Sequence, residues 1–380
     1  MQRLVNAVQR YAWGSTTAIQ DFLGEAVDGE PAAELWMGTH PSAPSRVEHE
    51  DGTQVPLSEL IGGDLPYLLK VLAAASPLSL QVHPTAKTAA LGFATEQNAG
   101  LALDSPRRNF RDPHPKPEMA YALTRLESLV GFRPTANLLD VLRQVNAPLT
   151  DRMFATLESR PGYPGIVALL AELLDPGPSV AEVSAVTDAC ARLVAAGVDV
   201  DRAYSTVVEV AAFFPGDVGV VASLLLNRIT LEPGEAAYLA PGIVHAHLSG
   251  MCLEVMSASD NVLRAGLTPK HRDPQTLLQC LEEGMSDAAY VDPIAVDGSS
   301  QVFAPPVTNF MLSITRADVD GAQLPASGRR IVICIEDKVE ITARDLTMTL
   351  ARGEAVFADQ SDGPLTVTGT GVVAQAYEPA

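Results

Sequence analysis

Four residues with metal-binding side chains stand in three distant parts of the sequence. They are Gln81, His83, Glu118 and His245. In an extended strand the side chains of residues i and i+2 leave the same face, so one strand could present both Gln81 and His83. Imidazole nitrogens, a carboxylate and an amide oxygen together suit a borderline divalent ion such as zinc. The four residues therefore predict a metal site that water or substrate would complete.

A proline-rich segment leads to the carboxylate of this set. Each even-numbered residue from Asp112 to Lys116 precedes a proline, and a residue before proline is driven toward extended backbone. The even-numbered side chains of an extended segment share one face. If Glu118 points at a metal, we expect Lys116 and His114 to point into the same cavity. Our hypothesis is that Lys116 or His114 serves in proton transfer.

The order of patterns along the chain predicts three units. The first part shows short apolar runs broken by proline, glycine and aspartate, which is typical of β-strands. Apolar residues then recur at helical spacing, and Ser179 with Glu182 has the form of a capping box. Strand signals return at residue 227. We therefore predict a mainly β fold with a first β domain at 1–133 plus 227–298, which carries the metal-binding residue types, a helical insert domain at 134–226, and a C-terminal domain at 299–380.

An internal repeat relates the first β domain to the C-terminal domain. Residues Thr230–Gly250 align without gaps with Thr349–Gly369, and both segments read as strand, glycine-containing turn, strand. Chance similarity between hairpins is the alternative explanation. His245 falls opposite Pro364 in this alignment. We therefore expect the C-terminal domain to be a second barrel that has no metal site.

The bulk composition excludes several classes of function. The 380-residue chain has a formal net charge of −20 and a pI near 4.7, which argues against nucleic acid as a partner. No apolar stretch approaches the roughly 20 residues of a membrane span, and the N-terminus lacks the features of a signal peptide. The four cysteines stand far apart, as expected for reduced thiols. These features predict a cytoplasmic protein with no membrane partner.

Three segments together resemble the type I mannose-6-phosphate isomerases, also called phosphomannose isomerases. They are Pro77–Pro84, Lys116–Glu118 and Leu253–Lys270, of which the last is the most specific. Tyr11–Ser15 and Glu34–Pro41 give supporting matches, so the likeness covers the chain in order to about residue 275. It implies a cupin (jelly-roll) barrel with one zinc ion per chain, an inserted helical domain and a second cupin-like domain.

The resemblance also implies an activity and a set of site residues. The activity is the interconversion of D-mannose 6-phosphate and D-fructose 6-phosphate by proton transfer between C1 and C2 through an enediol, a step of carbohydrate metabolism toward GDP-mannose. By the match, the four predicted ligands take the family's zinc positions. Further residues fall on positions that line the family's substrate pocket, namely Ser79, Lys116, Glu254, Arg264 and Lys270.

The residue types suit that chemistry. Arg264 could stabilise the oxyanion charge of the enediol, and Lys270 is expected to contact phosphate or sugar. Glu254 is either a pocket acid or a partner that orients another site residue. The positive charges of Arg264, Lys270 and Lys116 stand out in an otherwise acidic protein and would concentrate an anionic sugar near them.

Two positions depart from the family pattern. The family commonly has His-Ala-Tyr-Leu where this chain has His245 to Leu248, so His247 replaces a tyrosine. His247 would either fill the tyrosine's place near the substrate or compete as a metal ligand. Ala86 stands where a lysine is common, and Lys87 follows it. Outside these motifs, we expect His40 and His49 in solvated loops, and Trp13 and Trp36 as packing residues.

Two other classes of function remain as alternatives. A cupin oxygenase would use iron, commonly through a compact His-x-His motif, which here occurs only at His245 and His247. A non-catalytic sugar-phosphate-binding cupin would keep the phosphate cations and could lose its metal ligands. We expect a small-molecule phosphosugar as substrate and a monomer or weak homo-oligomer.

Overall fold

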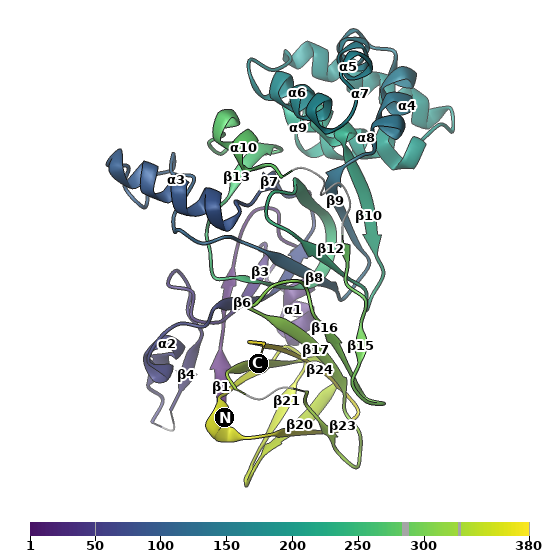
Figure 1. The fold of residues 1–380 in the computed structure, drawn as a ribbon. Helices are drawn as coiled ribbons and strands as arrows, with labels where there is room; N and C mark the ends of the chain where they lie inside the picture. The colour runs from purple at the N-terminus through teal and green to yellow at the C-terminus, as the bar shows by residue number, and fades with distance from the viewer. Residues whose placement is uncertain (50, 283–288, 326–327, 380) are drawn as a thin grey trace.

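Figure 1 shows the computed structural model of the chain, which describes residues 1–49, 51–282, 289–325 and 328–379. Strands make up most of the ordered elements, and helices gather in one part of the chain. The predicted mainly β fold with helices is therefore confirmed. Among the described residues, no helix combines the length and the apolar character that a membrane span requires.

The larger sheet carries the residues that the sequence singled out. Its main path runs in the order β14-β11-β8-β12-β6-β3-β2, while β7 and β9 also pair with β12 and bring β13 and β10 with them. The strands are β2 (Ala7–Gln9), β3 (Glu34–Met37), β6 (Tyr67–Ala74), β7 (Leu80–Val82), β8 (Glu118–Ala122), β9 (Leu126–Phe132), β10 (Leu226–Leu231), β11 (Ala236–Leu239), β12 (His245–Ser257), β13 (Leu263–Gly266) and β14 (Ala289–Tyr290).

Most of the helices lie between β9 and β10, two strands that pair antiparallel, and form the helical cluster at the top of Figure 1. They are α4 (Thr135–Val145), α5 (Pro148–Ser159), α6 (Tyr163–Leu174), α7 (Val180–Ala195), α8 (Ala203–Phe213) and α9 (Val218–Ala222), with short 3-10 turns at Val200–Arg202 and Ser223–Leu225. The capping box of α7 is confirmed, because Ser179 Oγ accepts the Glu182 N–H and the Glu182 carboxylate accepts the Ser179 N–H. Outside this cluster lie α1 (Ala18–Leu23), α2 (Leu57–Ile61), α3 (Ala86–Asn98) and α10 (Pro274–Cys280).

The second group of sheets combines both ends of the chain. A sheet in the order β15-β16-β17-β24-β19-β22-β1-β4-β5 lies beside a smaller sheet in the order β18-β23-β20-β21. The strands β1, β4 and β5 come from the first 60 residues, so the sheets divide the chain differently from the predicted boundary near residue 299. The bounds are β1 (Gln2–Val5), β4 (Arg46–Glu48), β5 (Gln54–Pro56), β15 (Ile294–Ala295), β16 (Ser300–Phe303), β17 (Met311–Arg316), β18 (Ala322–Gln323), β19 (Arg330–Glu336), β20 (Lys338–Ala343), β21 (Leu346–Ala351), β22 (Ala355–Ala358), β23 (Leu365–Gly369) and β24 (Val372–Tyr377), with a 3-10 turn at Gln360–Asp362.

Continuous apolar cores join these parts. One core runs from the helices into the larger sheet, where Leu142 and Val207 belong to the same buried cluster as Leu80. Another joins the two large sheets, since Leu253 of β12 clusters with Ile331 of β19. Burial of this apolar surface is the main favourable term that holds the strands in register. The site residues therefore stand on elements that are packed on more than one side.

The long strand β12 changes partners halfway along its length. His245–Ser249 pairs with β7 and β9, whereas Gly250–Ser257 pairs with β6 and β8. The register shifts between His247 and Ser249, and Gly250 has a φ of +114°, which favours glycine. This bend lets the two ends of one strand reach the same part of the interior.

Candidate metal centre and adjoining pocket

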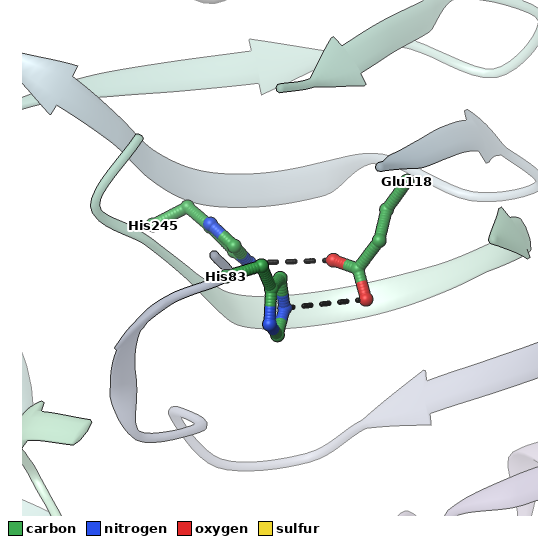
Figure 2. Close-up of side chains that lie close together, drawn as sticks. All are labelled: His83, Glu118 and His245. Carbon is green, nitrogen blue, oxygen red and sulfur yellow. Dashed lines mark ion pairs between the residues drawn. The ribbon is translucent and has the colours of Figure 1, made fainter. Parts of the chain in front are cut away.

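Three of the four predicted ligands meet in the interior of the larger sheet. His83 follows β7, Glu118 begins β8 and His245 begins β12, and Figure 2 shows their side chains pointing toward one another. One ligand atom from each lies within 4.8 Å of the others, and all three side chains are buried. In the described part of the chain they form the one such group of His, Cys, Asp and Glu side chains. The structure thus brings together three of the four residues that the sequence singled out.

The cluster is arranged around the carboxylate. The His83 Nε2 lies 3.3 Å from one oxygen of Glu118, and the His245 Nε2 lies 3.3 Å from the other. The fourth predicted ligand is adjacent, because Gln81 faces His245 across β7 and β12 and its amide lies 3.4 Å from the His245 Nε2. Rotation of an amide by 180° exchanges its oxygen and nitrogen, so Gln81 can offer oxygen at this point.

Backbone carbonyls fix the orientation of both imidazoles. The His83 Nδ1 lies 2.7 Å from the carbonyl oxygen of Asn261, and the His245 Nδ1 lies 3.1 Å from that of Ile243. A carbonyl only accepts hydrogen bonds, so each Nδ1 carries the hydrogen and each Nε2 presents a lone pair. Such contacts are typical of metal-ligating histidines.

These lone pairs fit a cation at the centre of the cluster. Burial lowers the pKa of His83 to about 4, although Glu118 acts in the opposite direction, so its imidazole is neutral at pH 7. The buried Nε2 of His83 has no hydrogen-bond partner among the described residues and faces a carboxylate oxygen. Two acceptors that face each other in the interior are unfavourable unless a cation lies between them. The donor set of two imidazoles, a carboxylate and an amide matches zinc.

A cavity of about 530 Å³ opens directly beside the cluster. Gln81, Lys116 and Glu118 lie in its wall next to the metal centre. The helical region also contributes, through Phe213 and Phe214 at the end of α8. Of the residues placed in the pocket by resemblance, all five line this cavity, namely Ser79, Lys116, Glu254, Arg264 and Lys270.

Two cations in this wall form no ion pair within the described part of the chain. They are the half-buried Arg264 and the exposed Lys270, whereas the buried Lys70 and Lys116 are each paired with a carboxylate. Burial lowers the pKa of Lys270, and the neighbouring charges of Arg264 and Arg111 lower it further. Cations held close together without a counter-charge form a favourable place for an anion.

A buried charge network lies in the same wall and was missed at the sequence level. Lys70 of β6 lies 3.3 Å from a carboxylate oxygen of Glu34 and 3.1 Å from one of Glu254. Trp36 donates its indole N–H to the other oxygen of Glu34, 2.9 Å away, and its ring lies under the Lys70 ammonium. The available signal was a single lysine within the apolar run Tyr67–Ala75, because lysine is almost never buried without a partner.

Two predicted site residues do not reach the cavity. His114 is exposed and does not line it, because residues 111–114 form a bend instead of the extended segment that the prolines predicted. Asn261 holds this bend by accepting the Arg111 N–H and by donating to the carbonyl oxygens of Asp112 and His114. His247 is buried, belongs neither to the metal cluster nor to the cavity wall, and lies behind Glu254. The two roles considered for His247 therefore stay predictions, and in the structure its nearest link to the cavity is Glu254.

His40 is a further correction. Only 5 % of its surface is exposed, and it lines the cavity instead of lying in a solvated loop. Its Nδ1 accepts the Ser42 N–H, and its Nε2 lies 3.2 Å from a carboxylate oxygen of Asp260, which also lines the cavity. Trp13 and Trp36 likewise face this space in addition to packing. The local sequence held no chemical signal for His40 beyond its place in the segment Glu34–Pro41.

Comparison with known proteins gives one consistent family. Residues 1–135 match a family model described as the catalytic domain of type I phosphomannose isomerase. The mannose-6-phosphate isomerase of Escherichia coli is 35 % identical over 395 residues, with 99 % of each chain covered. The human mannose-6-phosphate isomerase is 30 % identical over 401 residues and covers 92 % of this chain and 91 % of its own.

Solved structures agree with these relatives. A crystal structure of mannose 6-phosphate isomerase from Salmonella typhimurium, bound to its substrate and to zinc, superimposes with a TM-score of 0.90. It shares 32 % sequence identity, and the superposition covers all of both chains.

Proposed function

This chain belongs to the type I phosphomannose isomerases, enzymes that interconvert D-mannose 6-phosphate and D-fructose 6-phosphate, and we propose that the cavity beside His83, Glu118 and His245 carries the reaction. One observation supports this assignment above the others. The same cavity lies beside a buried group that could hold a metal ion, and its wall also carries Arg264 and Lys270, which form no ion pair with a described carboxylate. A phosphosugar has hydroxyl and carbonyl oxygens for the first and a phosphate for the second.

Zinc is the cofactor that we assign to the cluster. His83, Glu118 and His245 would hold one ion per chain, with Gln81 as the fourth protein ligand. A bound zinc ion supplies a Lewis acid that polarises sugar oxygens. The remaining tasks belong to this chain's own side chains. They must fix the phosphate, stabilise the negative charge that develops on the enediol oxygens and move one proton between C1 and C2.

Lys70 and Arg264 suit the electrostatic task. Burial alone would lower the pKa of Lys70, but Glu34 and Glu254 outweigh burial and raise it, so the ammonium stays charged. Burial would raise the pKa of Glu254, yet Lys70 and His247 together outweigh burial and hold the pKa at about 2. A carboxylate with so low a pKa is a poor base. We therefore assign Glu254 to holding Lys70, and Lys70 with Arg264 to stabilising oxyanion charge.

Lys116 is the group that we assign to proton transfer. Its Nζ lies 3.1 Å from Glu118, and it lines the cavity next to the metal centre. His114, the other candidate, is exposed. Phosphate binding falls to Lys270, with Ser79 as a neutral donor in the same wall.

The finer description of the fold is also a proposal. We propose that the larger sheet is the zinc-binding cupin barrel and that residues 134–226 are a helical domain inserted into it. The strands after residue 299 would form a second cupin-like barrel that has no metal site, with β1, β4 and β5 added to its sheet. The acidic charge favours a monomer or weak homo-oligomer in the cytoplasm.

An assay of the purified chain tests the function against its alternatives. Metal analysis is combined with enzyme-coupled detection of fructose 6-phosphate formed from mannose 6-phosphate. We expect zinc-dependent turnover that disappears after exhaustive chelation and returns with zinc. An iron oxygenase would instead contain iron and consume oxygen, and a binding protein would retain the phosphosugar without forming product. Full turnover after complete metal removal would rule out the zinc mechanism.

A further inference from the structure

The histidine that replaces the family's tyrosine belongs to a buried chain of polar contacts. The His247 Nδ1 lies 2.8 Å from Ser128 Oγ, and its Nε2 lies 3.6 Å from one carboxylate oxygen of Glu254. The other oxygen of Glu254 contacts Lys70 at 3.1 Å. Each of these four residues has at most 6 % of its surface exposed, namely His247, Ser128, Glu254 and Lys70. Of these four, only Glu254 and Lys70 line the sugar cavity.

The strand geometry explains why these side chains meet. His247 faces Ser128 across β12 and β9, and Glu254 faces Lys70 across β12 and β6. In a straight strand, residues seven apart would lie more than about 20 Å from each other on opposite faces. The register shift after His247 and the positive φ of Gly250 bend β12, so its two ends face each other across the interior.

The contacts select one tautomer of His247. The Nε2 is buried and has no hydrogen-bond partner among the described residues, and its nearest acidic neighbour is Glu254. A lone pair in that place would face carboxylate charge, whereas an N–H would be attracted to it. With the hydrogen on Nε2, Nδ1 is an acceptor, and the Ser128 hydroxyl donates to it. Ser128 thus directs the His247 N–H toward Glu254.

We propose that His247, oriented by Ser128, is a positioning residue that holds the Glu254 carboxylate and, through it, the Lys70 ammonium at the wall of the sugar pocket. The proposal rests on the proposed function, because Lys70 is there assigned to stabilising the enediol. His247 contacts Glu254 on the side away from Lys70, which fixes both oxygens of the carboxylate. A side chain at position 247 that cannot donate a hydrogen bond leaves one carboxylate oxygen of Glu254 without a contact, and the carboxylate and Lys70 can then shift.

Four variants test this with the full chain and zinc. They are His247→Leu, His247→Gln, Ser128→Ala and the His247→Leu/Ser128→Ala double variant, with the exposed His49→Leu as the matched control. We expect His247→Leu to lower kcat about tenfold, because small displacements of an oriented group are costly. KM and zinc affinity should change less than about twofold. Glutamine, which can place an amide N–H near the Nε2 position, should restore most of kcat.

Coupling separates positioning from general packing. Ser128→Ala should lower kcat several-fold when His247 is present and have no effect in His247→Leu. Equal impairment by leucine and glutamine, wild-type kcat in His247→Leu, or a loss of zinc affinity that parallels kcat would each overturn the proposal. If the wild-type chain does not isomerise mannose 6-phosphate, the proposed function fails by itself. A double-mutant cycle of His247→Leu and Glu254→Gln, measured on the free energy of unfolding, then tests whether the two side chains interact. If the effects of the two substitutions simply add, the contact between His247 and Glu254 is contradicted.

Discussion

At the scale of single residues, the pocket is defined by where its charges are paired and where they are not. Lys70 is enclosed by two carboxylates, whereas Arg264 and Lys270 have no such partner in the described part of the chain. A paired and buried charge is held in place but costs desolvation. An unpaired cation at an opening is ready for an anionic ligand. This contrast separates the fixed, paired Lys70 from the cations that are open to an anionic ligand.

Replacement of Lys70 should damage both stability and turnover. Lys70→Met leaves the buried carboxylates of Glu34 and Glu254 without their cation, and we expect the free energy of unfolding to fall by about 3 kcal/mol. Urea denaturation measures this change. Lys70→Arg keeps the charge and serves as the control. A Lys70→Met protein with wild-type stability and kcat would contradict the role given to this network.

Lys270 should matter for binding and much less for chemistry. Because it is assigned to phosphate at the open side of the pocket, Lys270→Met should raise KM for mannose 6-phosphate about tenfold with little change in kcat. Inhibition by inorganic phosphate should weaken by a similar factor. The exposed Lys338 of β20 offers a matched Lys338→Met control. A loss confined to kcat would place Lys270 at the reacting carbons instead.

At the scale of elements, β12 is the strand on which the site depends. It carries His245 at one end and Glu254 beyond a bend, so the metal centre and the charge network are set by one backbone path. A Cβ added at Gly250 would overlap the carbonyl oxygen of Arg125, and its φ of +114° is unfavourable for any other residue. The bend therefore requires glycine.

Gly250→Ala should accordingly destabilise the protein. We expect the free energy of unfolding to fall by at least about 2 kcal/mol, since both backbone strain and overlap with neighbouring backbone are involved. Gly298→Ala is the control, because no atom lies near its added Cβ and its φ is not in the left-handed region. Equal thermal midpoints for the two variants would show that β12 can bend without glycine.

Local sequence predicts some features of the site, whereas others depend on long-range contacts. The i, i+2 spacing of Gln81 and His83 predicted that both side chains lie near one site, and the Ser179 capping box predicted the start of α7. Both predictions were possible because each signal depends only on residues that are close in sequence. The exposed position of His114 was not predictable, since long-range hydrogen bonds from Asn261 override the preference of residues before proline. Lys70 was missed because its partners Glu34 and Glu254 lie on other strands.

At the scale of the whole molecule, a strongly acidic protein holds a locally basic pocket. The net charge of −20 opposes the compact state, while Arg264 and Lys270 attract an anionic sugar. Salt screens both effects. From about 20 to about 300 mM NaCl we expect the urea midpoint to rise and KM for mannose 6-phosphate to rise as well. A parallel KCl series controls for specific ions, and a midpoint that falls with salt would contradict the expectation.

The central claim is that a single metal centre, built by His83, Glu118 and His245, carries the isomerase activity of this chain. Titration of zinc into the metal-free protein, with bound zinc and fructose 6-phosphate formation measured on the same samples, tests it most directly. We expect activity to rise in proportion to bound zinc and to stop rising at one ion per chain, and we expect His83→Ala to show no such zinc-dependent rise in activity. Activity that is independent of zinc, or that appears only with a second ion per chain, would contradict it.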